Sequence, residues 1–345
     1  MLKIDRYTFA TSLLFTLFCL LLLIIIESFF TFLNELQDIG DDQYQLIDMI
    51  KFLLYDMPAR VYRIFPMALL LGTLLGLGQL ASHNELTAIR TAGFSKARTL
   101  RGAIYTTLLL SAVIVWVGEY IVPPTHEEAL VVSHKNSSNK GFWAIDGDYI
   151  IEVRSLENLT LKNINVYSAK DQALYKWIKA PEMVLSNNEW VMPSFTEITF
   201  NPDIITDQKG QDFALNTHID KTALNALVND PEYLSSQDLW RFITYLEQNN
   251  LDSSEYRLAF WSKVFNPLIN ISMILIAAPL VFAQQRRQGI GERILIGVIL
   301  GLIIYLMTQM LGHFILISGF PPIIGALFPA IFAMLIAYGL FKLLP

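Results

Sequence analysis

Six long hydrophobic segments constrain this chain more than any other feature of its sequence. A helix that crosses a membrane needs about 20 mainly apolar residues, because each residue rises about 1.5 Å through a hydrocarbon core about 30 Å thick. The segments that meet this length lie at about 9–33, 61–80, 104–122, 260–282, 294–317 and 323–344. Charged residues make up only 16% of the chain, against about 25% in soluble proteins. The sequence therefore predicts an α-helical membrane protein with six transmembrane helices.

The first segment follows Lys3 and Arg6, as the apolar part of a secretory signal does. It is nearly continuous from Leu13 to Leu33, whereas the apolar region of a signal peptide is about 7–15 residues long. Residues 34–36 offer no small-residue cleavage site. We therefore expect a first span that stays in the chain.

Charges in the short connecting segments predict the orientation, because Lys and Arg are retained on the cytoplasmic side. Basic residues gather between spans two and three (Arg90, Lys96, Arg98, Arg101) and between spans four and five (Arg286, Arg287, Arg293). The segment between spans one and two is acidic instead, with Glu35, Asp38, Asp41, Asp42 and Asp48 against Lys51. Both termini are therefore expected in the cytoplasm, and the interval from about 123 to 257 in a bacterial periplasm.

This long interval changes to short alternating segments, which are typical of strands. Residues 142–145 and 148–153 flank Asp146-Gly147, a residue pair favoured in tight hairpin turns. Further strand candidates are Leu161–Tyr167, Ala173–Val184, Glu189–Met192, Glu197–Phe200 and Asp212–Ile219. Such a run predicts an all-β domain, either jelly-roll-like or a small sandwich, and periodicity does not separate the two.

Two helices are expected after the strands. The apolar face of the first is formed by Leu239, Phe242, Ile243 and Leu246, with Ser235 or Ser236 as its N-cap. The second begins near Ser253-Ser254 and runs straight into span four. The expected division is helices one to three at 1–122, a periplasmic β-domain at 123–234, a helical connector at 235–259 and helices four to six at 260–345.

Motifs for catalysis or metal binding are scarce. His126-Glu127-Glu128 begins like a zinc motif, but Leu130 stands where a second histidine is needed, so we interpret it as a solvated segment next to the membrane. The one cysteine, Cys19, cannot form an internal disulfide, and a net charge of −6 does not indicate nucleic-acid binding. The sequence has no phosphate-binding loop. We expect neither enzyme activity nor a cofactor in this chain.

The segment 82–95 has the pattern of a short amphipathic helix that Gly93 ends. One face holds Leu86, Ile89 and Ala92, while Glu85 and Arg90 are expected in water. Two interpretations fit equally well. The helix lies on lipid headgroups, or it inserts into a groove of a cytoplasmic ATPase as a coupling helix.

Several residues within the spans also allow two interpretations. Glu27 lies deep in the first span, where a charge costs at least about 2.5 kcal/mol, and a structural polar contact is favoured over a proton relay. Arg257 and Lys263 fit either ordinary phospholipid headgroups or an anionic lipid substrate. Aromatic residues at the outer ends fit an interfacial belt or a wide cavity: Phe29, Phe30, Phe32, Phe65 and Phe314. Small-residue pairs predict close helix packing: Gly72 with Gly76, and Gly297 with Gly301.

A series of motifs runs in order over nearly the whole chain. They are Phe65-Pro66-Met67-Ala68 with Leu74-Leu75-Gly76-Leu77-Gly78, Asn84-Glu85-Leu86 with Ala92-Gly93-Phe94-Ser95, Gly118-Glu119-Tyr120 with Pro123, Gly141-Phe142-Trp143-Ala144, Trp261-Ser262-Lys263-Val264-Phe265, and Gly319-Phe320-Pro321-Pro322. Together they resemble the lipopolysaccharide-export permease family (LptF/LptG), and most of all its LptG type.

The resemblance implies the parts of an ATP-driven exporter. Family members pair as an LptF–LptG heterodimer, bind a dimer of the ATPase LptB, which holds ATP and magnesium, and recruit LptC. With LptA they carry lipopolysaccharide from the outer leaflet of the inner membrane, through a periplasmic β-jelly roll, towards the outer membrane. The ATPase-coupling residues implied for this chain are Glu85, Leu86, Ile89, Arg90, Gly93 and Phe94. The implied lipid cavity is lined by Phe29, Phe32, Phe65, Tyr305 and Phe314.

The chain departs from the family pattern where the lipid head group is expected. The LptG type carries lysines near the outer end of span one and basic residues after span three. This chain has Thr31, Gln37, Asp38, Leu130 and Ser133 there. The remaining candidates for meeting the phosphates are Lys51, Arg60, Arg63, Lys135, Arg257 and Lys263. A basic partner subunit or an unusual lipid A would also fit.

Two other classes stay open. One is a transmembrane subunit of another ATP-driven complex, for lipoprotein extraction or mechanotransmission. That class usually has four spans, so a count of six argues against it. The other is a membrane scaffold or sensor, which would bind no cytoplasmic ATPase.

Overall fold

The computed structural model describes residues 3–40, 44–133, 142–146, 149–157, 160–170, 173–186, 189–200, 205–215, 226, 229–283 and 290–343. The chain divides into two compact units. The helical unit comprises Met1–Gln37, Tyr55–His126 and Ser254–Pro345, and the second unit comprises Asp38–Leu54 and Glu127–Ser253.

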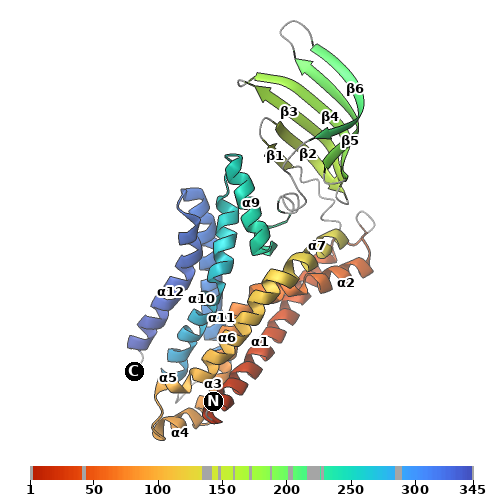
Figure 1. The fold of residues 1–345 in the computed structure, drawn as a ribbon. Helices are drawn as coiled ribbons and strands as arrows, with labels where there is room; N and C mark the ends of the chain where they lie inside the picture. Colours follow the sequence, from red (N-terminus) through yellow and green to blue (C-terminus); the bar gives the residue numbers. More distant parts are fainter. Residues whose placement is uncertain are drawn as a thin grey trace. The chain divides into compact units, whose positions relative to one another are not determined.

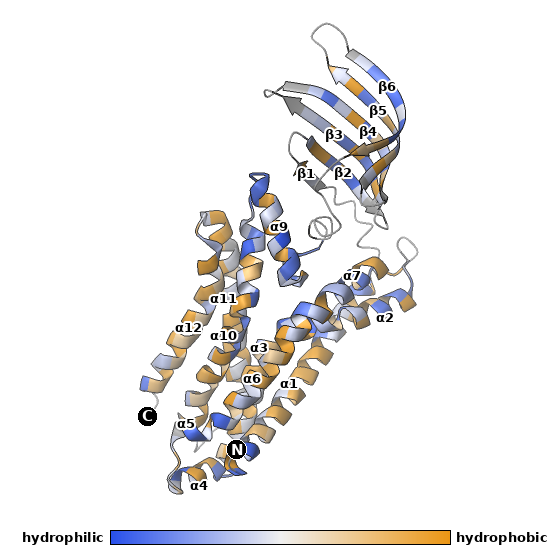
Figure 2. Ribbon diagram, viewed as in Figure 1, coloured by the Kyte–Doolittle hydropathy of each residue, from blue (hydrophilic) through white to orange (hydrophobic). Residues whose placement is uncertain are grey.

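Long helices make up most of the helical unit (Figure 1). They are α1 (Lys3–Glu35), α3 (Met57–Ser82), α6 (Arg101–Trp116) with its continuations η1 (Val117–Ile121) and α7 (Val122–Val132), α10 (Ser254–Ala283), α11 (Ile290–Ser318) and α12 (Pro322–Leu343). Within the described residues, six spans are long and apolar enough to cross a membrane, and Figure 2 shows how hydrophobic residues predominate along α1 and α12. The prediction of a six-span helical membrane protein is confirmed. Two short helices, α4 (Glu85–Thr91) and α5 (Lys96–Thr99), join α3 to α6.

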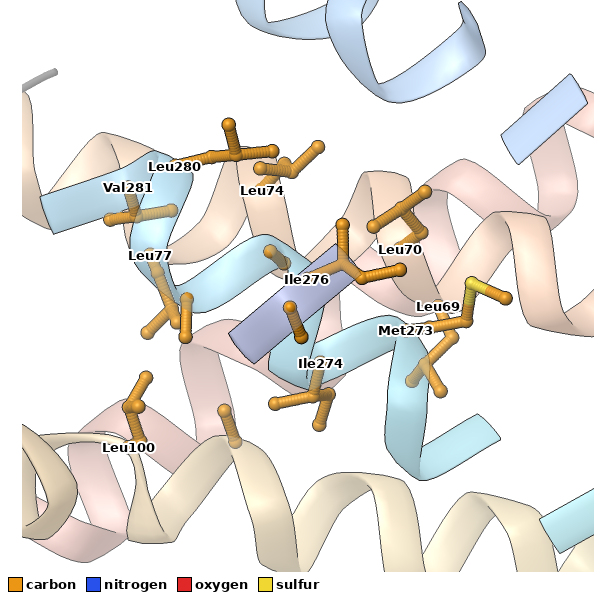
Figure 3. Packing of buried hydrophobic residues seen from close by; sticks show 14 of the residues in the cluster. Leu69, Leu70, Leu74, Leu77, Leu100, Met273, Ile274, Ile276, Leu280 and Val281 are labelled. Atoms are coloured by element: carbon orange, nitrogen blue, oxygen red, sulfur yellow. The ribbon is translucent and has the colours of Figure 1, made fainter. Parts of the chain in front are cut away.

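Helices α3 and α10 form the centre of the helical unit. In their most apolar stretches, 72% of the α3 residues and 56% of the α10 residues are buried, against 17% for α1 and 18% for α11. The side chains that pack between them are drawn in Figure 3: Leu69, Leu70, Leu74 and Leu77 of α3, and Met273, Ile274, Ile276, Leu280 and Val281 of α10. Helices α1 and α11 pack on α3, and α12 packs on α10. The outer helices therefore turn large apolar faces away from this chain.

Small residues make the closest helix contacts. Gly72 of α3 lies so near Thr16 of α1 that a β-carbon at this glycine would overlap the backbone of the threonine. Gly76 also faces α1, while Gly297 and Gly301 of α11 face leucine and methionine side chains of α3. The packing role predicted for both glycine pairs is confirmed, because small residues let helix backbones approach each other.

The second unit holds a six-stranded antiparallel sheet. Its strands are β1 (Phe142–Asp146), β2 (Tyr149–Glu157), β3 (Thr160–Lys170), β4 (Ala173–Ser186), β5 (Glu189–Phe200) and β6 (Ile205–Leu215). Each strand pairs with the next one along the chain (Figure 1). In the predicted hairpin, Asp146 of β1 pairs with Tyr149 of β2, and the turn residues 147–148 lie outside the described residues. A β-domain between the third and fourth membrane helices is therefore confirmed.

The two faces of the sheet differ in burial. Ala144, Ile151, Val166 and Ile178 are cross-strand neighbours on β1 to β4, and all four are almost fully buried. The opposite face carries an aromatic stack in which Tyr167 lies between Trp143 and Trp177. Alternation of inward and outward side chains is the period-two pattern that predicted the strands.

Two strand predictions were wrong in detail. Glu189–Met192 and Glu197–Phe200 belong to one strand, β5, which runs through Pro193. Pro193 has no partner in the ladder on either side, which suits a residue without an N–H. Strand β6 begins at Ile205 and not at Asp212, because its first half is a polar segment without the alternation that marks a strand. Residues 216–219, also predicted to be extended, lie outside the described residues.

The helices expected after the strands are present. In α9 (Ser236–Gln248), the Ser235 hydroxyl accepts a hydrogen bond from the N–H of Asp238 at 3.1 Å. The predicted apolar face is buried: Leu239, Phe242, Ile243 and Leu246. Helix α10 begins at Ser254 and continues without a break through Pro267 and Pro279.

Two of the longer helical stretches were not predicted. One is α2 (Leu46–Tyr55), which buries Met49 and Phe52. The other is α7, which continues directly from η1 and contains Pro123 and Pro124 in its first turn. The domain boundary expected at 123 therefore falls inside a helix, and the first described strand begins at Phe142.

Candidate functional site

The short helix α4 lies in the segment predicted to be amphipathic. Asn84 precedes it in the left-handed region with φ 61°, and Gly93 follows it with φ 89°. The N–H of Gly93 donates to the Arg90 carbonyl at 3.0 Å, and the N–H of Phe94 donates to the Ile89 carbonyl at 3.4 Å. These bonds close the helix end that Gly93 was predicted to make.

One face of α4 is anchored in the helical unit. Leu86 is fully buried and belongs to the same cluster as Leu80 of α3 and Leu100, while Ile89 packs against that cluster. The Tyr7 side chain of α1 lies near the Glu85 side chain. Leu86 and Ile89 therefore hold the helix to its own chain. Ala92, which was expected on this buried face, is exposed.

The other face of α4 is open. A shallow depression there is lined by Thr87, Arg90, Thr91, Gly93, Phe94 and Ser95. The Arg98 guanidinium lies 5.2 Å from the centre of the Phe94 ring, within the distance of a cation–π contact. Arg90 is exposed and Glu85 is half-buried. The structure thus divides the predicted coupling residues: Arg90, Gly93 and Phe94 border the open face, Glu85 lies near Tyr7 of α1, and Leu86 and Ile89 anchor the helix.

The aromatic residues predicted to line a lipid cavity also fall into two groups. Phe29 of α1 and Phe314 of α11 are more than half exposed, at 56% and 59%, and Tyr305 of α11 is 45% exposed. Phe32 is half-buried. Phe65, in contrast, is only 1% exposed and belongs to the core between α3 and α10. Phe65 therefore packs in the core of the helical unit, and the other four residues lie at the surface of this unit.

Two of the predicted basic residues are in ion pairs on α3. Arg63 pairs with Glu27 of α1, so the structural polar contact expected for Glu27 is confirmed. Arg60 has only 1% of its side chain exposed, and its Nε donates to the Asp56 carboxylate at 2.8 Å. A lipid phosphate would have to enter the protein interior to meet Arg60.

The other basic candidates differ in exposure. Lys51 of α2 is half exposed and pairs with Asp48 at 3.5 Å, and Arg257 near the start of α10 is exposed. Lys263 of α10 is half-buried, and its Nζ donates to the Gly118 carbonyl at 3.2 Å. Lys135 lies outside the described residues. Arg63, Lys51 and Arg257 are thus the more accessible cations among the described candidates.

A buried polar cluster at the start of α3 was not predicted. Asp56 accepts hydrogen bonds from Arg60 at 2.8 Å and from a ring nitrogen of His126 on α7 at 3.0 Å. Burial alone would raise the pKa of Asp56, but the hydrogen bonds and charges of His126 and Arg60 outweigh burial and hold this pKa below its usual value. The cluster ties α3 to α7.

The interpretation of His126 as part of a solvated segment was wrong, because its side chain is buried against Asp56. The four-residue spacing of Asp56 and Arg60 could have indicated an ion pair on one helix face. Nothing in the sequence linked either residue to His126, 70 positions away. Among the residues that the structure describes, no group of His, Cys, Asp or Glu side chains could hold a metal ion.

Comparisons with known proteins give a consistent result over nearly the full length. The family model described as lipopolysaccharide export system permease LptF/LptG matches residues 6–343. The lipopolysaccharide export system permease protein LptG of Escherichia coli K12 is 29% identical over 344 residues, which cover 95% of this chain and 94% of that protein. The protein of the same name from Haemophilus influenzae is 29% identical over 340 residues, with 95% of each chain covered.

Proposed function

The chain belongs to the LptF/LptG family of lipopolysaccharide export system permeases, and from this premise we propose that it extracts lipopolysaccharide from the outer leaflet of the inner membrane with energy from a separate ATPase. As a member of this family with six apolar spans, it is a multi-pass inner-membrane permease. Its β-domain would then receive the lipid and pass it towards the outer membrane. The observation that carries the proposal is the open face of α4 on an otherwise anchored helix.

The ATPase is proposed to dock on this open face. The sequence has no phosphate-binding loop of its own, so ATP and magnesium would be held by an LptB-type dimer. Arg90, Gly93 and Phe94 border the depression, and Glu85 supplies a carboxylate at the first turn of the same helix. Because Leu86 is fixed in the core, a push on α4 would move α3 with it.

Other partners are proposed for the outer helices and the β-domain. Helix α1 and helix α11 bury less than a fifth of their apolar stretches within this chain. An LptF-type permease would cover part of these surfaces, and the lipid would lie between the two subunits against Phe29, Phe32, Tyr305 and Phe314. LptC and LptA would continue the path from the β-domain. The basic loops favour both termini in the cytoplasm and the β-domain in the periplasm.

The accessible cations are proposed to meet the phosphates of the lipid. Arg63 is 38% exposed although it pairs with Glu27, and Arg257 and Lys51 are open to solvent or headgroups. An Arg that already has a carboxylate partner can still offer its remaining N–H groups to a phosphate, because guanidinium has five donors.

The coupling proposal is tested by co-purifying the whole complex with Glu85→Ala or Arg90→Ala. Each variant should bind the ATPase roughly thirty-fold more weakly, because losing one partner of a charged pair at a buried interface costs about 2 kcal/mol or more. Glu255→Ala, at an exposed acid near the start of α10, is the matched control and should retain full ATPase binding. Full ATPase binding and activity in a chain without residues 82–95 would exclude the coupling role.

The substrate proposal is tested by photocrosslinking in cells. A crosslinker at Phe29 or Phe314 should capture lipopolysaccharide, whereas one at Phe65 should not, because Phe65 is sealed in the core. Absence of a lipid adduct at every exposed aromatic position would contradict lipid binding by this chain.

A further inference from the structure

The third span contains a π-helical turn that is followed, after Val122, by two prolines, so the Gly118 carbonyl is left without a helical donor. In η1 the N–H of Val122 donates to the Val117 carbonyl, five residues back. An α-helix would have given that N–H to the Gly118 carbonyl, four residues back. Continuing the five-residue pattern, the Gly118 carbonyl would need the N–H of residue 123, which is Pro123 and has none.

A side chain from another helix takes the place of this missing donor. Lys263 of α10 places its Nζ 3.2 Å from the Gly118 carbonyl oxygen. The same ammonium lies 5.8 Å from the centre of the Tyr62 ring of α3. A β-carbon at position 118 would overlap the Tyr62 ring, so glycine is required for the ring to pack there. Three helices therefore meet at one carbonyl.

We propose that Lys263 is a positioning residue that replaces the amide proton absent at Pro123 and so fastens the third span to the fourth. Its ammonium makes a charge-assisted hydrogen bond, which is stronger than a neutral one. This contact, the Lys263 clip, holds η1 in its π-helical form and fixes the angle at which α6 continues into α7. Lys263 thus donates to a backbone carbonyl of its own chain and is not a free cation available to a lipid phosphate.

The position of the clip gives it a role in the proposed transport. Helix α6 begins next to α5 and α4, the proposed site of the ATPase, and α7 carries His126, which is bonded to Asp56 of α3. A displacement that starts at α4 and travels along α6 has to pass η1. With the clip closed, α6 and α10 move together. Without it, the π-helical turn can bend and absorb the displacement. This step depends on the proposed function, whereas the clip itself depends only on the geometry.

A double-mutant cycle in the complete complex tests the clip. Lys263→Met removes the donor and keeps an unbranched apolar side chain, so the lipid-stimulated ATPase and lipid release from vesicles should fall roughly ten-fold, the change expected for a carbonyl left without its charged donor. Lys263→Arg should keep most of the activity. Pro123→Ala restores an N–H at the position that can reach Gly118, so Lys263→Met combined with Pro123→Ala should return to within about two-fold of the wild type.

The neighbouring proline supplies a matched control. Pro124→Ala also restores an N–H, but in the five-residue pattern that group points to the Glu119 carbonyl and not to Gly118. Lys263→Met with Pro124→Ala should therefore stay as impaired as Lys263→Met alone. Equal rescue by both prolines, or rescue by neither, would overturn the proposal.

A spectroscopic readout separates the clip from transport. Val113 of α6 and Val264 of α10 are both about half exposed, so spin labels can be placed there in a Cys19→Ser background. The distance distribution should be narrow in the wild type, broader in Lys263→Met and narrow again when Pro123→Ala is added. An unchanged distribution in Lys263→Met would refute the clip, even if transport is impaired. If the complex exports no lipid but the distance distributions change as expected, the clip is supported and the proposed function is contradicted.

Discussion

The first membrane helix and the β-sheet bury opposite kinds of side chain. In α1 the buried residues are Asp5, Thr8, Ser12, Thr16, Cys19 and Glu35. Its large apolar residues point outwards instead, with Ile25 and Phe30 both 60% exposed. In the sheet, Ile151, Val166 and Ile178 are at most 1% exposed. The buried side of α1 is thus mainly polar and its exposed side apolar, whereas the buried row of the sheet is apolar.

The difference shows which solvent each region was built for. In water, removing apolar surface from the solvent is the main force that drives packing. The buried row of the sheet is stabilised in this way. In hydrocarbon that force is absent between helices, so association depends on close packing of small residues and on hydrogen bonds between helices. The predictions below test this contrast, from the largest expected effect to the smallest.

A charge placed inside the sheet should have the largest effect. Ile178→Asp puts a carboxylate at the β4 position of the buried row and should cost roughly 4 kcal/mol, because an unpaired charge is buried. The sheet should become sensitive to protease while the membrane helices still insert. Ser194→Asp, at an exposed position of β5, is the control. A protease-resistant sheet in Ile178→Asp would show that its core is not sealed from water.

Enlarging a glycine in the membrane contact should come next. In Gly72→Leu the new side chain meets the backbone of Thr16, which cannot move aside, and overpacking of this kind costs roughly 3 kcal/mol. Gly339→Leu adds the same side chain to α12, where no atom lies within 4 Å. Unfolding titrations in detergent should separate the two variants. Equal stability would contradict small-residue packing as the force that holds α1 to α3.

These contrasts also explain what could be predicted from the sequence. Six spans and the β-hairpin follow from patterns within one segment, and both were found. The partners within the helical unit depend on contacts between segments. Nothing local marks Thr16 as the neighbour of Gly72, or His126 as the partner of Asp56. The same limit applies to the site: the end of α4 followed from Gly93, but the burial of Leu86 and Phe65 follows from their neighbours on other helices.

The buried ion cluster offers a prediction on pH. Because the folded-state pKa of Asp56 is lowered, its stabilising contribution is complete above the unfolded value of about 3.9 and is lost as the pH falls through the folded value. At neutral pH, Asp56→Asn should cost about 2 kcal/mol through the loss of charged hydrogen bonds to Arg60 and His126. The variant should also lose less stability than the wild type below about pH 4. Glu255→Gln, at an exposed position, should keep the wild-type profile, and identical acid profiles for Asp56→Asn and the wild type would rule out the cluster as the cause.

The smallest effect is expected from a hydrogen bond between two membrane helices. Thr106 of α6 donates its hydroxyl to the Phe9 carbonyl of α1 at 3.1 Å, and it also lies 3.2 Å from the Gly102 carbonyl of its own helix. Thr106→Val keeps the shape and should cost only about 0.6 kcal/mol, the average for such bonds in membranes. Thr11→Val is the matched control, since Thr11 bonds only to Tyr7 of its own helix. If both variants lose the same stability in unfolding titrations, the bond between α1 and α6 contributes nothing beyond a local one, and small-residue packing alone accounts for their association.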